Sequence, residues 1–355
     1  MLKRLQMSRL LLPFVAAAFC AGAAAPARAQ IDTGNGPLPV FEFHSGFWLN
    51  LHHTLYYAGR QQFLAAQGNV NASATPPLLA GLPEAELRPW KEAVAYYAAN
   101  FVAKDLLFAT DLIQLKDQLG DFEDCSDLSG TRQKFCNAGL DPKLTRLLET
   151  AAPVYRAHLW PVHDKANRRW VFAVAPLVRS QSVGLSHRLS DIYQTHWPRY
   201  RIRVDMTAYA NWAGAYTTVD PLRVTISSTD PGNQGNVALE VLFHEASHGI
   251  AEPVEQAIIR ECRQRDKAIP RDLWHALVFY TTGEVIRPIM ARAAAAQAQS
   301  GDGAPAEPYQ PYAVRGGLYS RGWLRYHELL AQFWQPYLDN SETFDDAIAR
   351  MVSAL

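Results

Sequence analysis

The chain has 355 residues, 48% of them hydrophobic, and its 34 Lys and Arg equal its 34 Asp and Glu in number. This length and apolar content allow a large buried core, and the balanced charge argues against nucleic acid as a partner. The sequence shows no internal repeat, and the absence of a long Gly/Ser/Pro linker before residue 295 favours one continuous folded unit.

Residues 1–29 have the pattern of a secretory signal peptide. Three cations precede an apolar run from Leu10 to Ala25, and Ala27-Arg28-Ala29 offers small residues to a signal peptidase. The run is shorter than the ~20 residues that span a bilayer, so we expect cleavage before Gln30 and no stable membrane insertion. Cleavage leaves 30 Lys and Arg against 34 Asp and Glu, and the mature chain is predicted to be secreted or periplasmic.

The region 30–199 is predicted to be helical. Aromatic residues at spacings of three and four indicate an amphipathic helix within 41–66, after Gly46, and similar patterns predict two helices over 84–119 and further helices over 141–158 and 164–195. His44, His52 and His53 lie in or beside the first helix. We interpret them as locally bonded core histidines, with a cleft wall as the alternative.

Cys125 and Cys136 bracket a polar segment, and in an oxidising compartment they are expected to form a disulfide. A calcium site in the neighbouring acidic cluster is a weaker interpretation, because the cluster lacks the regular ligand spacing of a calcium loop. Cys262 is left over and is interpreted as a buried free thiol.

The pattern changes at Tyr200. Alternating segments over 201–209, 213–219 and 222–228 predict three short strands. Beyond the next helix, residues 271–296 are predicted to form a long helix, 297–311 an exposed loop, and 321–337 and 341–354 a last pair of helices.

The most informative motif is His244-Glu245-Ala246-Ser247-His248, which follows directly after the strands. On a helix, residues four apart share one face, so two imidazoles can converge on one metal ion while the Glu borders a water on that ion. The surrounding segment, Val237 to Ile250, has no proline and predicts a half-buried helix. The competing interpretation is an ordinary amphipathic helix that carries two histidines.

The H-E-x-x-H motif and its strand–helix context resemble the zincin metallopeptidase superfamily, in a gluzincin-like arrangement. The resemblance covers about residues 200–290 and implies a zincin-like catalytic region over 200–355, in an α+β fold that is predominantly α-helical, with a small sheet before the metal helix. It also implies that an edge strand lies above that helix and binds an extended substrate. Residues 210–218 would then line the cleft, although ordinary sheet core explains them equally well.

A catalytic Zn²⁺ needs three protein ligands, so one more donor must join His244 and His248. By resemblance to gluzincins, in which a Glu on a downstream helix is the third ligand, we choose Glu284. His275 is the main alternative, and it lies half a turn away from Glu284 around the same helix, so both cannot face one ion. Glu252 would serve only if the chain turned at Gly249.

The predicted activity is hydrolysis of peptide bonds in a peptide or protein substrate, with Glu245 as general base. The resemblance further implies a Tyr or His that stabilises the oxyanion. We choose Tyr319, in a Gly-rich segment, ahead of His327, Tyr280 and Tyr216. Glu240, one turn before His244, is interpreted either as a residue that orients an imidazole or as a solvated side chain.

Two other functions compete with this one. The first is a catalytically inactive secreted protein that binds zinc or a substrate on the same fold, and the second is a helical envelope scaffold with a fortuitous motif. Retention of Glu245 argues against the first, because a pure metal site has no use for a general base. The sequence does not reveal the oligomeric state, the side-chain preference, or whether cleavage is internal or terminal.

Overall fold

The computed structural model describes residues 40–355 except 70–72, 74 and 300–306. The predicted signal peptide and residues 300–306 of the loop predicted over 297–311 therefore lie outside the described residues. The predominantly helical α+β composition is confirmed. Within the described residues, no helix is long and apolar enough to cross a membrane.

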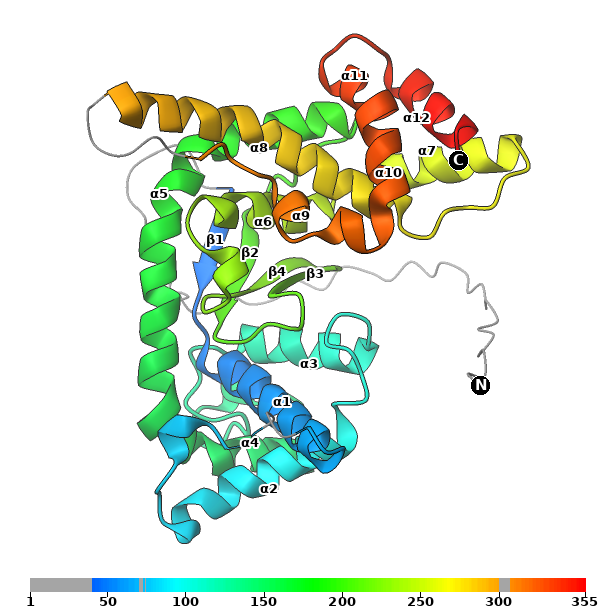
Figure 1. Cartoon of the computed structure of the whole chain (residues 1–355). Helices are drawn as coiled ribbons and strands as arrows, with labels where there is room; N and C mark the ends of the chain where they lie inside the picture. The colour runs from blue at the N-terminus through cyan, green and yellow to red at the C-terminus, as the bar shows by residue number, and fades with distance from the viewer. Residues whose placement is uncertain (1–39, 70–72, 74, 300–306) are drawn as a thin grey trace.

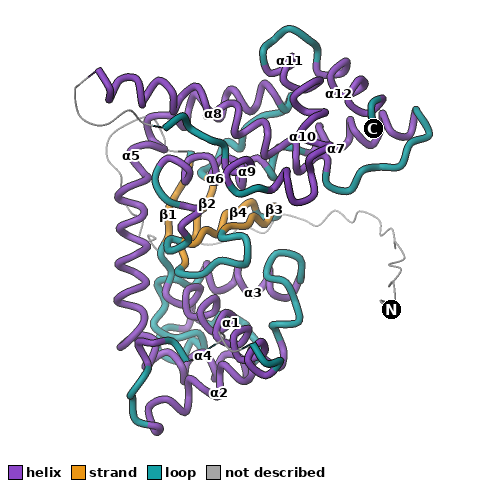
Figure 2. Tube along the Cα trace, viewed as in Figure 1, coloured by secondary structure: helices purple, strands orange, loops and turns teal. Residues whose placement is uncertain are grey.

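A four-stranded mixed sheet lies at the centre of the molecule, with helices on both of its faces (Figures 1 and 2). Its order is β1-β2-β4-β3; the first three are parallel and β3 is antiparallel to β4. The strands are β1 (Phe41–His44), β2 (Ile202–Thr207), β3 (Ala215–Val219) and β4 (Leu222–Ser227). The three strands predicted after Tyr200 are confirmed. Strand β1 was not predicted; it lies in the region 30–199, which was expected to be helical.

The helices that follow β1 form a bundle on one side of the sheet (Figure 1). They are α1 (Phe47–Ala66), α2 (Glu84–Asn100), α3 (Thr110–Asp121) and α4 (Pro142–Val154). Their apolar side chains make one core cluster, to which the sheet contributes Tyr216. The disulfide between Cys125 and Cys136 is present beside this bundle, and Cys262 is free and buried, as expected.

The other side of the sheet is covered by the helices that follow it in the sequence. They are α6 (Asn236–Ser247), α7 (Glu252–Gln264), α8 (Leu273–Gln299), α9 (Tyr312–Arg315), α10 (Leu324–Leu329), α11 (Gln335–Leu338) and α12 (Phe344–Ser353). A second core cluster joins these helices to the apolar side chains of the sheet, such as Val204, Val224 and Ile226. These side chains alternate with polar ones on the opposite face, because successive residues of a strand point to opposite sides.

Helix α5 (Trp160–Ile192) runs along the side of the molecule past both layers (Figure 1). At its crossing with the sheet, buried Asn167 donates hydrogen bonds from Nδ2 to Met206 O (3.1 Å), Asn50 Oδ1 (3.2 Å) and Ser45 Oγ (2.9 Å), and its Oδ1 accepts one from Ser228 (2.6 Å). A single amide therefore links α1, α5 and the ends of two strands.

Replacing Asn167 by Ala is expected to lower the free energy of unfolding by about 2–3 kcal/mol, because buried polar partners lose their hydrogen bonds. Chemical denaturation measures the change. The matched control is Asn100→Ala at the exposed end of α2, where a change below about 0.5 kcal/mol is expected. Equal effects of the two substitutions would contradict the assigned role of Asn167.

Candidate metal centre

His244 in helix α6 and His248, the residue that caps its C-terminus, lie on one face, one turn apart. Every residue of α6 after Asn236 is buried, because the helix lies between the sheet and α8. The rings of the two histidines are perpendicular, with centroids 4.9 Å apart. The helix ends at Ser247, and Gly249 follows in the turn. A Cβ at position 249 would lie 2.6 Å from Leu222, so glycine permits the chain to turn here against the start of β4.

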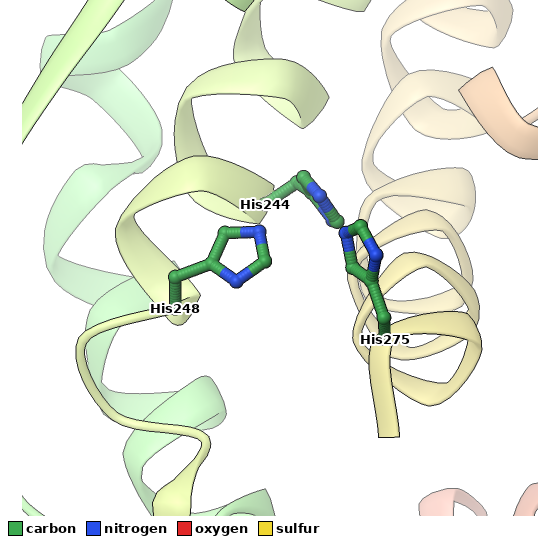
Figure 3. Close-up of side chains that lie close together, drawn as sticks. All are labelled: His244, His248 and His275. Carbon is green, nitrogen blue, oxygen red and sulfur yellow. The ribbon is translucent and has the colours of Figure 1, made fainter. Parts of the chain in front are cut away.

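The third member of the group is His275 in the first turn of α8. One ring nitrogen of each of His244, His248 and His275 lies within 4.8 Å of the others. Figure 3 shows the three rings directed toward one another from the two neighbouring helices. The centroid of His275 is 5.0 Å from that of His248 and 5.4 Å from that of His244.

Glu284, the expected third ligand, is not part of this group. Its carboxylate pairs with Arg287 one turn along α8. The half-turn separation between His275 and Glu284 holds in the structure, so it is the imidazole that faces α6 and the carboxylate that faces away. Glu252 is exposed at the start of α7 and is also outside the group. The structure therefore favours His275 over both carboxylates as the third ligand.

All three imidazoles lie in an environment that favours their neutral form. Burial, together with His248 and His275, lowers the pKa of His244 well below its ordinary value. Burial lowers the pKa of His248 to about 3, assisted by His275, and that of His275 to about 4. A neutral imidazole has a free lone pair, which is the form that binds a metal ion.

The residues fit a bound transition metal. Buried His244 Nδ1 has no hydrogen-bond partner among the described residues, and an unpaired buried nitrogen needs a proton partner, a water or a metal. Three nitrogens around tetrahedral zinc lie about 3.3 Å apart, so the rings need only small torsional changes to close on an ion. Among the described residues this is the one cluster of His, Cys, Asp and Glu with ligand spacing. The acidic residues near the disulfide do not form another.

Glu245 follows His244 on α6, lines the same small cavity as His244, and is buried. Thr217 of the edge strand β3 places its hydroxyl 2.8 Å from Glu245 Oε2 and 2.9 Å from the Glu245 carbonyl oxygen, and donates to them. Burial raises the pKa of the Glu245 carboxyl to about 7, partly offset by the hydrogen bond from Thr217. The carboxylate thus has the proton affinity of a base that works near neutral pH.

Tyr319, the expected oxyanion-stabilising residue, lies elsewhere. Its ring stacks on that of His327 at a centroid distance of 4.4 Å, in a π-helical turn over residues 319–323. Two other candidates for the oxyanion-stabilising role, Tyr280 and Tyr216, also use their hydroxyl groups in hydrogen bonds elsewhere. Tyr280 donates to Gln335 Oε1, and Tyr216 pairs with His53 on the opposite face of the sheet.

Tyr312, at the start of α9, borders a cavity that His244 and Glu245 also line. Its ring stacks on Phe279 (centroids 5.9 Å apart), which stacks in turn on His244 (3.6 Å). No hydrogen bond of the Tyr312 hydroxyl is found within the described part of the chain. The sequence offered little signal for this residue, because it follows a loop and begins a helix of only four residues.

Glu240 does not orient an imidazole, and it is not solvated. Its two carboxylate oxygens accept hydrogen bonds from the Tyr309 hydroxyl (2.5 Å) and the Tyr312 backbone N–H (2.8 Å). Burial raises the pKa of Glu240 to about 7. Its structural effect is to hold the segment 309–312 against α6, and thereby to position Tyr312.

No protein-family model, curated protein or solved structure matches this chain.

Substitution of His275 is expected to remove high-affinity metal binding, whereas substitution of Glu284 is not. We expect His275→Ala to weaken Zn²⁺ binding by at least about 100-fold, since even outer partners of a ligand contribute 10–100-fold. Glu284→Gln should bind one equivalent of Zn²⁺ with the affinity of the wild type. Titration of the purified, metal-stripped chains against a zinc indicator measures both. The reverse pattern would return Glu284 to the ligand set.

Proposed function

We propose that this protein is a secreted or periplasmic zinc-dependent peptidase. The observation that carries the proposal is the convergence of three imidazoles, one of which, His244, shares a cavity wall with the buried carboxylate of Glu245. Three neutral nitrogen ligands with a remaining position for water are typical of catalytic zinc sites. The bound ion would lower the pKa of a water molecule and polarise the carbonyl of the bond to be cleaved.

Glu245 would act as the general base. Its carboxylate accepts a proton from the attacking water and delivers it to the nitrogen of the leaving amine. Thr217 supports this role by holding Oε2 of the carboxylate, which leaves Oε1 without a partner among the described residues. A protein that only stores or carries a metal has no need for such a group next to the ligands.

Strand β3 supplies a docking edge for an extended substrate. Gly214 O accepts from Ser227 N, and in an antiparallel ladder the residues that bond to the partner strand alternate with those that do not. Tyr216 and Thr218 therefore bond to β4, whereas the N–H and C=O groups of Ala215 and Thr217 point away from β4. A polypeptide that adds to this edge would pass the ligands and Glu245.

The arrangement supports the resemblance to zincins in one respect and departs from it in another. An edge strand next to the motif helix is what that resemblance implies. The histidine group, however, offers the imidazole of His275 where a gluzincin would have a carboxylate. We therefore propose a zincin-like peptidase with a three-histidine ligand set. In this proposal Tyr312, which borders the cavity and whose hydroxyl has no hydrogen-bond partner among the described residues, donates a hydrogen bond to the developing oxyanion.

The proposal predicts that Glu245→Gln abolishes hydrolysis without loss of the metal. Removal of a general base lowers kcat by about 10²–10⁴-fold. The measurement is cleavage of a mixed peptide library, followed by mass spectrometry, with zinc content determined on the same samples. Glu252→Gln, at an exposed position nearby, is the matched control and should retain full activity. Stoichiometric zinc without hydrolysis in the wild type would instead support an inactive zinc-binding protein.

Tyr312→Phe is expected to lower kcat by about 10²-fold with little change in KM, because the hydroxyl acts mainly in the transition state. Tyr319→Phe is the matched control and should change kcat by less than about threefold, since its ring packs on His327. Steady-state kinetics on one cleaved peptide distinguishes the two. If Tyr319→Phe were the more damaging change, the residue chosen from the sequence would be reinstated.

A further inference from the structure

A small cavity opens beside the candidate metal centre, and we call it the α6 pocket. It is bordered by Ala213, Ala215, Glu240, Val241, Phe279 and Tyr312. His244 and Glu245 form its remaining wall, so it is continuous with the site of the proposed chemistry. Ala215 also belongs to the outer strand β3, and its backbone N–H and C=O groups point away from β4. A substrate that pairs with this edge would thus direct a side chain next to the cleaved bond into the α6 pocket.

The α6 pocket is small. Its volume is about 40 Å³, and a water molecule needs roughly 10–15 Å³ by this measure. The space therefore holds about three water molecules, or a side chain of one to three heavy atoms. Leu, Phe, Lys and Arg side chains exceed this size.

The walls have little freedom to widen the space. Phe279 is fixed between the rings of His244 and Tyr312. Tyr312 is held through its backbone by Glu240, and Val241 belongs to the buried helix α6. A Cβ at Gly283 would lie 2.6 Å from Pro311 and 3.2 Å from Glu240 Oε1, so α8 and the segment before Tyr312 are also in close contact.

The chemistry of the lining also favours a small side chain. Ala213, Ala215 and Val241 supply methyl groups, and Glu240 is the one carboxylate besides Glu245. Both oxygens of Glu240 already accept one hydrogen bond, and each keeps a second lone pair. A methyl group or a short hydroxyl fits such a lining.

We propose that the α6 pocket binds the side chain adjacent to the cleaved bond and selects a side chain of at most three heavy atoms, such as that of Ala, Ser, Cys, Thr or Val. This inference rests on the proposed peptidase function and names its substrate class, namely extended polypeptides with a small residue at the cleavage site.

The test uses binding of hydroxamates, which chelate zinc, to the zinc-loaded mature chain. Two series present the variable side chain on the carbonyl side and on the amine side of the zinc-binding group, each with methyl, isobutyl, benzyl and aminobutyl members. Calorimetry gives the Kd values. In one series we expect the methyl compound to bind at least about 10-fold more tightly than the isobutyl and benzyl compounds, because steric discrimination in an apolar pocket is of this size.

Val241→Ala enlarges the α6 pocket and should reduce the methyl-to-isobutyl preference by about 5–10-fold. Val237→Ala is the matched control, since Val237 is buried one turn earlier on α6 but does not border the pocket. It should leave the ratio of Kd values unchanged even if stability falls.

Three results would overturn the inference: equal binding of the methyl and benzyl compounds in both series, tightest binding of the aminobutyl compound through Glu240, or equal effects of the two valine substitutions. Hydrolysis of the peptide library is scored separately. A retained methyl preference without any hydrolysis would refute the peptidase but not the pocket, whereas hydrolysis with large residues on both sides of the cleaved bond would refute the pocket alone.

Discussion

Burial of α6 between the sheet and α8 is the constraint on which the rest of the site depends. It excludes water from His244, Glu240 and Glu245, and partly from His248 and His275. Desolvation disfavours the charged form of each group, so the pKa values of the histidines fall and those of Glu240 and Glu245 rise. The same packing therefore keeps the three imidazoles in the neutral form that could bind a metal ion.

Much of this arrangement was predictable from the sequence, because it depends on local patterns. The spacing of His244 and His248 placed both on one helical face, and alternation after Tyr200 revealed three strands. The disulfide between Cys125 and Cys136 was also predicted from the sequence. Strand β1 was missed, because four residues before a helix carry almost no periodic signal and its partner β2 is more than 150 residues away.

The choice of the proposed third ligand could not be made from local sequence patterns. Sequence spacing established that His275 and Glu284 face opposite sides of one helix, but not which side of that helix packs on α6. Rotation of α8 is set by tertiary contacts, including the stacking of Phe279 on His244. Tyr312 was missed for a related reason. Its position depends on the hydrogen bond from its backbone N–H to Glu240. The two residues are 72 positions apart, and no sequence pattern links them.

The sheet combines two distant segments of the chain, residues 41–44 and 202–227, and this limits how the protein can be divided. Strand β1 precedes the helical bundle, yet it covers the outer side of β2, and α5 packs across both cores. A fragment that begins at residue 200 would leave the ladder of β2 uncapped, with a row of unpaired amides and carbonyls facing solvent. Such an edge invites intermolecular strand pairing. We therefore expect that the part of the chain from residue 200 onward does not fold as an independent unit, and that its solubility depends on strand β1.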